Sequence, residues 1–168
     1  MIKNLVELTK VRIGFLVLTT TIIGFYLGAQ GSFSSSLLIY TILGTLFSST
    51  GGSILNNVIE IDSDKNMERT KRRVLPTKKI SFRFALTLGL FFAISGLSIL
   101  YFKVNTLTAT LSLSTILLYL FVYTPLKRVS WINTSIGAIP GAIPPLGGWT
   151  AATNSLDLGG IALFLILF

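Results

Sequence analysis

The sequence predicts an all-α protein, a polytopic transmembrane helical bundle with about five complete spans plus the start of a sixth. Only 12% of the 168 residues are charged, whereas soluble domains carry about a quarter. The mean hydropathy is +0.76, and the charges are clustered so that long uncharged runs separate them. Runs of roughly 20 apolar residues are long enough to cross a bilayer as helices.

Five apolar segments meet this requirement, and in chain order they cover residues 13–29, 37–59, 84–102, 107–123 and 132–151. We expect the first to be a retained helix rather than a cleaved signal peptide, because its apolar core is long and further spans follow. The second contains the small-residue run 48–53, which favours close helix packing. The third and fourth contain no charged residue.

The fifth segment contains Pro140, Pro144 and Pro145 among several glycines. This pattern is typical either of a kinked packing helix or of broken backbone that lines a cavity. A sixth segment begins near Leu158, but the 11 residues to Phe168 cannot cross a membrane. We therefore expect residues 1–168 to be a single domain that is truncated on its C-terminal side.

Lysines and arginines predict the orientation. Thirteen of the 14 precede the first span, lie in the loop after the second or follow the fourth, and Lys103 is the exception. The connections 30–36 and 152–158 contain only Asp157 as a charged residue. Basic loops stay on the cytoplasmic side, so we expect the amino terminus and the loop after the second span to be cytoplasmic.

Composition also excludes several classes of site. The chain has no cysteine and no histidine, so these residues contain no disulfide, no thiolate or histidine metal site, no Ser-His triad and no histidine haem ligand. The net charge of +8 is better explained by basic loops facing anionic lipid than by binding of nucleic acid.

Four of the six acidic residues lie within residues 56–76, directly after the second span. In a continued helix, Asn56, Glu60 and Asp64 recur every four residues and share one face, and Glu68 has the same spacing. Carboxylate and amide oxygens suit Mg²⁺ completed by phosphate oxygens and water. Arginines and lysines beside them suit the same phosphate.

A solvated loop that marks the inside face is the alternative for this stretch. It explains the basic residues, but it explains the acids poorly, because like charges four positions apart repel each other. A second cluster at the end of the fourth span contains Tyr123 and Lys127, which could contact phosphate or could be ordinary interfacial residues.

These residues resemble a known family, the UbiA-type membrane prenyltransferases. Its first aspartate-rich motif, Asn-x-x-x-Asp-x-x-x-Asp followed by Arg-Thr-x-x-Arg, corresponds to Asn56, Glu60, Asp64, Arg69, Thr70 and Arg73. Tyr123-x-x-x-Lys127 resembles the family's diphosphate contact. The runs at 8–13, 67–71 and 137–149 are similar to the branch that farnesylates haem. Glu60 departs from the usual aspartate, Val11 and Val74 replace common prolines, and the family's second aspartate-rich motif would lie beyond Phe168.

The resemblance implies transfer of a farnesyl group from farnesyl diphosphate to the vinyl group of haem B, which gives haem O. Asn56, Glu60 and Asp64 would be the catalytic Mg²⁺ ligands, with Asp62 as a weaker candidate. Diphosphate would contact Arg69, Arg73, Tyr123 and Lys127, helped by Lys10 and Arg12. Haem B would be a substrate rather than a cofactor.

The resemblance also implies a setting for this reaction. The membrane would be a bacterial plasma membrane or the mitochondrial inner membrane, with the site on the cytoplasmic or matrix side. Contact with haem A synthase or with terminal-oxidase assembly would fit this role. Two alternatives stay open: a UbiA-type enzyme acting on an aromatic quinone precursor, and a membrane transporter or scaffold without chemistry.

Overall fold

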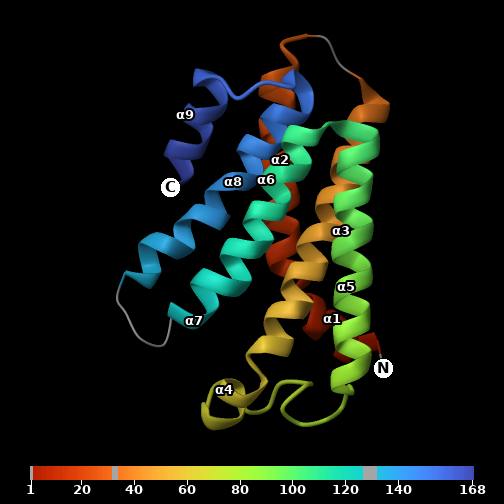
Figure 1. The fold of residues 1–168 in the computed structure, drawn as a ribbon, viewed down its shortest axis with the longest axis vertical. Coiled ribbons are helices and arrows are strands. Elements are labelled where there is room, and N and C mark those ends of the chain that lie inside the picture. Colours follow the sequence, from red (N-terminus) through yellow and green to blue (C-terminus); the bar gives the residue numbers. More distant parts are fainter. Residues whose placement is uncertain (1, 32–33, 127–131) are drawn as a thin grey trace.

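The structure is a computed structural model that describes residues 2–31, 34–126 and 132–168. In chain order the first part comprises α1 Ile2–Thr9, α2 Val11–Ala29, α3 Ser35–Ile59 and α4 Ile61–Asn66. The second comprises α5 Phe82–Ile99, the π-helical η1 Leu100–Val104, α6 Thr106–Leu117, the π-helical η2 Leu118–Tyr123, α7 Thr124–Leu126, α8 Asn133–Thr153 and α9 Leu158–Leu167. No strand occurs in the described ranges, and the long helices form one bundle (Figure 1). The predicted all-α class is confirmed.

Four helices in the described parts of the chain are long and apolar enough to cross a membrane. They are α2, α3, α5 continued by η1, and α6 continued through η2 and α7, with 19, 25, 23 and 21 residues. These four match the first four predicted spans. α8 matches the fifth in place and has 21 residues, but its prolines, glycines and threonines make it less apolar. α9 is the apolar helix expected near Leu158.

The amino terminus contains one more helix than the sequence predicted before the first span. α1 and α2 are separate helices, and Lys10 between them has left-handed backbone angles, φ 50° and ψ 49°. This conformation is costly for a residue other than glycine. Leu8 of α1 is fully buried in a cluster with Ile54, Val58 and Leu75, so packing holds α1 in place. The break therefore allows α1 to fold across the end of the bundle.

Close packing of small residues builds the bundle, mainly between α3 and α5 and between α2 and α8. A Cβ added to Gly96 of α5 would lie 2.7 Å from the carbonyl oxygen of Gly44 and 2.8 Å from Cα of Ser48, both in α3. Only glycine permits this approach of two backbones. The prediction that the run 48–53 is a packing face is confirmed.

The prolines of α8 do not end the helix. Pro140, Pro144 and Pro145 all lie inside a helix that runs from Asn133 to Thr153. α8 packs directly on α2, because a Cβ on Gly24 would lie 2.7 Å from the carbonyl carbon of Pro145. Pro144 also lines a small cavity of about 60 Å³ shared with α2, α3 and α6. The fifth segment is thus a packing helix that contributes to one small internal cavity.

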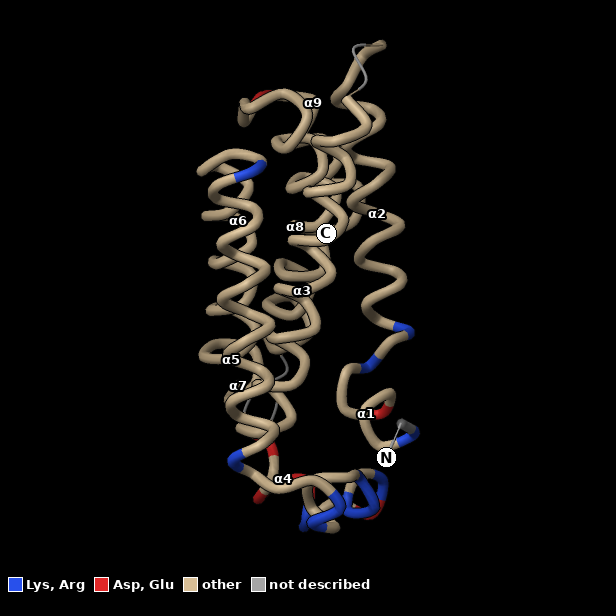
Figure 2. The backbone as a smooth tube through the Cα atoms, turned by 90° about the vertical axis from the view of Figure 1, so that its right-hand side faces the viewer, with Lys and Arg blue, Asp and Glu red and all other residues tan. Residues whose placement is uncertain are grey.

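Charged residues gather at one end of the bundle. Figure 2 shows blue and red segments concentrated around α4, the loop 67–81 and the amino terminus, with one blue and one red segment at the opposite end. Lys103 of η1 and Asp157 before α9 are the charged residues of the connections at that opposite end. The fold therefore reproduces the predicted grouping for the basic residues that the structure describes, whereas Lys127 and Arg128 lie outside the described ranges.

Candidate functional site

The stretch of residues 56–76 lies at the charged end, where α3 gives way to α4 and the loop 67–81 (Figures 1 and 2). α3 ends at Ile59, and Glu60 keeps helical angles of φ −85° and ψ −2°. The Glu60 N–H donates to the Asn56 carbonyl at 3.0 Å, and the Asp64 N–H donates to the Glu60 carbonyl at 2.8 Å. The spacing of four is therefore kept across the junction, which stacks Asn56, Glu60 and Asp64 one above the other.

Glu60 and Asp64 are buried carboxylates that share one cation. Their exposed fractions are 2% and 3%. Nη1 of Arg73 lies 2.8 Å from Oδ2 of Asp64 and 3.5 Å from Oε2 of Glu60. The hydroxyl of buried Thr70 donates to the Asp64 backbone carbonyl at 3.3 Å and helps to hold the loop against α4. Buried carboxylates of like charge repel, so the guanidinium stabilises the pair.

Asn56 connects three parts of the bundle. Its Oδ1 accepts from Nζ of Lys10 at 2.8 Å and from the hydroxyl of Tyr119 at 3.1 Å. Its Nδ2 donates to Oγ1 of Thr124 at 2.8 Å, and that hydroxyl donates to the Tyr119 backbone carbonyl at 2.7 Å. An amide oxygen has two lone pairs, and both are used here. Asn56 would have to release one donor before it could bind a metal ion.

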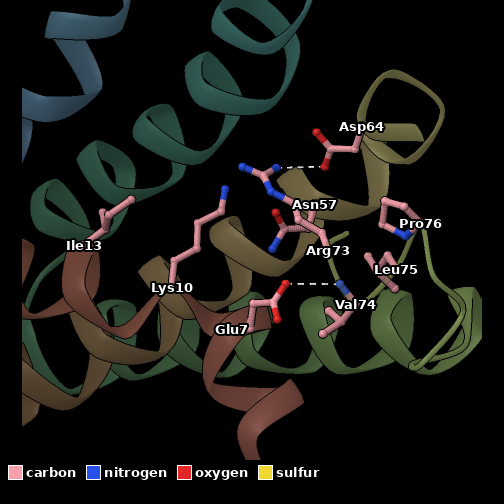
Figure 3. Close-up of a pocket in the computed structure, with 9 residues that line it drawn as sticks. All are labelled: Glu7, Lys10, Ile13, Asn57, Asp64, Arg73, Val74, Leu75 and Pro76. Atoms are coloured by element: carbon pink, nitrogen blue, oxygen red, sulfur yellow. Dashed lines mark hydrogen bonds and ion pairs between the residues drawn. The ribbon is translucent and has the colours of Figure 1, made fainter. Parts of the chain in front are cut away.

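A cavity of about 310 Å³ lies between α1, α3 and the loop 67–81. Figure 3 shows the side chains of Lys10 and Arg73 extending toward the same region of this cavity. Two hydrogen bonds frame it: Nδ2 of Asn57 donates to the Leu8 carbonyl at 2.9 Å, and the Val74 N–H donates to Oε1 of Glu7 at 3.2 Å. The lining residues are Glu7, Lys10, Ile13, Asn57, Asp64, Arg73, Val74, Leu75 and Pro76. The cavity has both acidic and basic walls, as a site for a metal-bound phosphate requires.

Other candidates from the sequence do not join this cluster. The Asp62 side chain is 92% exposed and pairs with Lys65 at 2.9 Å. Glu68 has left the shared face, because α4 ends at Asn66, and its exposed carboxylate pairs with Lys71 at 2.6 Å. Asp62 stays a prediction as a metal ligand, and its position in the structure does not support it.

The remaining candidate diphosphate contacts are only partly assembled. Arg69 and Arg12 are exposed, the first in the loop 67–81 and the second at the start of α2. Tyr123 is half-buried and stacks on Tyr119 with ring centroids 5.5 Å apart. Lys127 lies outside the described residues, so Tyr123-x-x-x-Lys127 is described only at its tyrosine.

Sequence reasoning did not find Tyr119, Thr124, Asn57 or Glu7. Tyr119 lies four positions before Tyr123 on the same helix face, which was an available signal. Asn57 and Glu7 reach the site through contacts between segments far apart in sequence, and no local pattern indicates such contacts. Tyr119 and Thr124 lie at and beside η2, a π-helical segment of the kind often found at functional sites.

The residues present suit Mg²⁺ only in company with a phosphate. The described chain has no cluster of three or more Asp, Glu, His or Cys side chains that could hold an ion. Mg²⁺ commonly uses one or two carboxylates and completes its octahedron with phosphate oxygens and water. Glu60 and Asp64 supply this set, and Oδ1 of Asn57 is a buried acceptor with no hydrogen-bond partner within the described residues.

Comparison with known proteins identifies the family. The model of the UbiA prenyltransferase family matches residues 17–168, which is most of the chain. The chain belongs to the UbiA prenyltransferase family. Among solved structures, a digeranylgeranylglyceryl phosphate synthase superposes with a TM-score of 0.86 at 20% identity, covering 99% of this chain and 58% of that one. With four helices long and apolar enough to cross a bilayer in its described residues, this member of the family is an integral membrane protein.

Another UbiA-family structure, a homologue from Archaeoglobus fulgidus, was solved with DMAPP and Mg²⁺. It superposes with a TM-score of 0.75 at 17% identity, covering 97% of this chain and 59% of that one. At this identity the likeness concerns the fold.

Curated relatives have higher identity to this chain. The mitochondrial protoheme IX farnesyltransferase of Homo sapiens is 44% identical over 98% of this chain and 37% of its own length. The protoheme IX farnesyltransferases of Cutibacterium acnes and Anaeromyxobacter dehalogenans are 43% and 41% identical over 97% and 99% of this chain. Those matches cover 49% and 56% of the two bacterial proteins. The chain thus spans roughly half the length of the relatives it matches.

Proposed function

We propose that this chain is part of an enzyme that transfers the farnesyl group of farnesyl diphosphate to a vinyl group of haem B and so forms haem O. Identities of 41–44% to proteins named protoheme IX farnesyltransferase support this choice of reaction. The use of a diphosphate substrate is supported above all by one observation, the buried pair Glu60 and Asp64 with Arg73 between them. Within the family, that arrangement favours prenyl transfer over transport or a purely structural role.

In the proposed reaction, the bond between the allylic carbon and oxygen breaks, and diphosphate leaves with the electron pair. The terminal vinyl carbon of haem B bonds to the farnesyl carbon. Water then adds to the resulting cation and loses a proton, which leaves a hydroxyethylfarnesyl side chain. Lys10 and Arg73 extend into the cavity and would bind the diphosphate oxygens. The diphosphate is anionic both before and after this bond breaks, so fixed cations at that position stabilise the bound substrate as well as the leaving group.

Glu60 and Asp64 would hold Mg²⁺ in this proposal, and Asn56 would join only by giving up a hydrogen bond. When bound, the ion supplies Lewis-acid stabilisation of the departing diphosphate. The side chains of the site also keep the reacting groups in place: Asn56 holds Lys10 and Tyr119, and Asp64 holds Arg73. Tyr123 and Arg69 are proposed as further contacts once diphosphate is bound.

We further propose that the charged end of the bundle faces the cytoplasm or the mitochondrial matrix. The concentration of basic residues at this end, with Lys103 at the other, supports this orientation (Figure 2). The same packing of α2 on α8 and of α3 on α5 supports the view that residues 1–168 form a single domain.

The protein at its full natural length, in lipid nanodiscs with Mg²⁺ and farnesyl diphosphate, allows a direct test. Haem B and 4-hydroxybenzoate are supplied separately, diphosphate release is followed continuously, and products are identified by mass spectrometry. We expect release of diphosphate and formation of haem O when haem B is the acceptor, and neither product with 4-hydroxybenzoate. Prenylated 4-hydroxybenzoate would replace the haem assignment with a quinone-type acceptor. If neither acceptor led to release of diphosphate, the assignment as an enzyme would be contradicted, and a transporter or scaffold would be favoured.

A further inference from the structure

Glu7 is an acidic residue of α1 whose side chain contacts the backbone of the loop 67–81. Its Oε1 accepts the N–H of Val74 at 3.2 Å, across 67 positions of sequence. Val74 directly follows Arg73, whose guanidinium bonds to Asp64. Figure 3 shows both interactions on the wall of the same cavity. An acid on α1 thus holds the loop backbone at the residue next to the cation of the site.

α1 is itself firmly placed. Leu8, the neighbour of Glu7, is 0% exposed and packs with Ile54 and Val58 of α3. The Leu8 carbonyl accepts from Nδ2 of Asn57 at 2.9 Å. The Glu7 carboxylate is therefore carried by a helix that is anchored to α3, the helix that leads into Glu60.

The loop 67–81 lacks a long helix, and several of its backbone hydrogen bonds are internal. The Arg73 N–H donates to the Thr70 carbonyl at 3.0 Å, and the Thr77 N–H donates to the Arg73 carbonyl at 3.1 Å. The bond from Val74 to Glu7 leads instead out of the loop to α1. It is a hydrogen bond to a charged acceptor, which is stronger than one between neutral groups.

We propose that Glu7 is a positioning residue: through the Val74 N–H it fixes the backbone beside Arg73 and so sets the affinity of the site for diphosphate. This inference rests on the proposed function, since it assigns Arg73 to diphosphate. Glu7 touches neither substrate directly in this account. Its removal weakens ground state and transition state alike, so KM for the prenyl diphosphate rises while kcat stays nearly constant.

The test compares Glu7→Ala, Glu7→Gln and Glu7→Asp in the full-length protein in nanodiscs. Glu7→Gln keeps an acceptor at the same reach, whereas Glu7→Ala removes it. We expect KM for farnesyl diphosphate to rise roughly tenfold in Glu7→Ala, as loss of a hydrogen bond to a charged group predicts. KM for haem B and kcat should change by less than about twofold, and Glu7→Gln, which keeps an acceptor but not its charge, should raise KM for farnesyl diphosphate less than Glu7→Ala does. Glu68→Ala, which removes an exposed acid from the same loop, is the matched control.

If Glu7 only stabilises the fold and does not position Arg73, the variants should behave differently. Glu7→Ala would then have a lower unfolding midpoint but an unchanged KM for farnesyl diphosphate, and that result overturns the proposal. Equal KM values in Glu7→Gln and Glu7→Ala, both raised, also overturn it. If Glu7→Ala does not fold, Glu7→Asp decides, because its shorter side chain should raise the same KM, and an unchanged KM contradicts the proposal.

Calorimetric binding of inorganic pyrophosphate with Mg²⁺ separates this inference from the proposed function. If wild-type protein binds pyrophosphate but forms no haem O, the reaction is wrong, and the Glu7 comparison can still be made on affinity. If haem O forms and Glu7→Ala binds pyrophosphate as tightly as wild type, the reaction stands and the positioning role is wrong. Roughly tenfold weaker binding by Glu7→Ala, with a smaller loss of affinity in Glu7→Gln, supports the role.

Discussion

Nη1 of Arg73 lies 2.8 Å from Oδ2 of Asp64, although the two residues are separated by the end of α4 and a turn of the loop 67–81. The same nitrogen lies 3.5 Å from Oε2 of Glu60. Arg69, the other arginine of the motif, is exposed. The fold therefore selects one of the two arginines of the motif to neutralise the buried carboxylates.

Asp64→Asn should nearly abolish turnover, because the amide cannot supply the negative oxygen that both Arg73 and a divalent ion need. A loss of about 100-fold or more in kcat is expected for removal of such a stabilising group. Diphosphate release from farnesyl diphosphate is the measurement. Glu68→Gln serves as the control, since Glu68 is exposed and paired with Lys71. Normal turnover by Asp64→Asn would remove the metal assignment, and Asp62→Asn in the same assay decides whether Asp62 takes part.

Arg73→Ala should destabilise the protein by about 3 kcal/mol, because it leaves buried Glu60 and Asp64 without their guanidinium. Arg73→Lys keeps the charge but loses the planar guanidinium fork, so its loss of stability should lie between zero and that of Arg73→Ala. Chemical unfolding in detergent measures both. Added Mg²⁺ should recover part of the stability of Arg73→Ala, since an ion bound to the folded state takes over the neutralising role. No recovery at millimolar Mg²⁺ would argue against a metal at these carboxylates.

Lys10 combines a strained backbone with a functional side chain, and two variants separate these contributions. Its left-handed angles, φ 50° and ψ 49°, cost a residue other than glycine about 1–2 kcal/mol. Lys10→Gly should therefore be more stable to unfolding than Lys10→Ala by about 1 kcal/mol. Both lose the ammonium that contacts Asn56, so both should raise KM for farnesyl diphosphate to a similar extent. A higher KM in one than in the other would show that backbone geometry, rather than the ammonium, controls binding.

The sequence predicted the parts of this site that follow local rules. Hydropathy placed the spans, and the spacing of four placed Asn56, Glu60 and Asp64 on one face, because helical hydrogen bonds continue through Glu60. The fold-back of Arg73 and the placement of α1 were not predictable in this way. They depend on burial of Leu8 and on long-range bonds such as that of Glu7, which leave no periodic pattern.

Asp157, at the end of the bundle opposite the site, should contribute to acid sensitivity. The hydroxyl of Ser155 donates to its Oδ2 at 2.6 Å, and the Gly159 and Gly160 N–H groups donate to Oδ1 at 3.0 and 3.2 Å. These bonds, with that of Ser155 foremost, lower the pKa of Asp157 below its ordinary value of 3.8. A carboxyl with a lower pKa when folded stabilises fully above its unfolded pKa, near 3.8, and loses this contribution as pH falls through the folded pKa.

Asp157→Asn should accordingly flatten the part of the stability profile below about pH 4. Ser155→Ala should flatten it less, because the backbone donors of α9 are retained. Unfolding midpoints between pH 3 and pH 6 provide the measurement. An Asp157→Asn profile parallel to that of the wild type would contradict the assignment.

Gly96 and Gly14 form a matched pair for testing how the bundle is held together. A Cβ at Gly96 would lie 2.7 Å from the Gly44 carbonyl oxygen of α3, whereas a Cβ at Gly14 meets nothing within 4 Å. Backbone atoms cannot rotate away as a side chain can, so Gly96→Ala should push α5 from α3 and cost about 1–3 kcal/mol. Gly14→Ala should be neutral or stabilise by up to about 1 kcal/mol, because alanine favours a helix. Thermal unfolding in detergent distinguishes the two, and equal midpoints would mean that α3 and α5 are not in backbone contact. Since α3 leads into Glu60 and Asp64, Gly96→Ala should also lower the affinity for pyrophosphate, whereas Gly14→Ala should leave it unchanged.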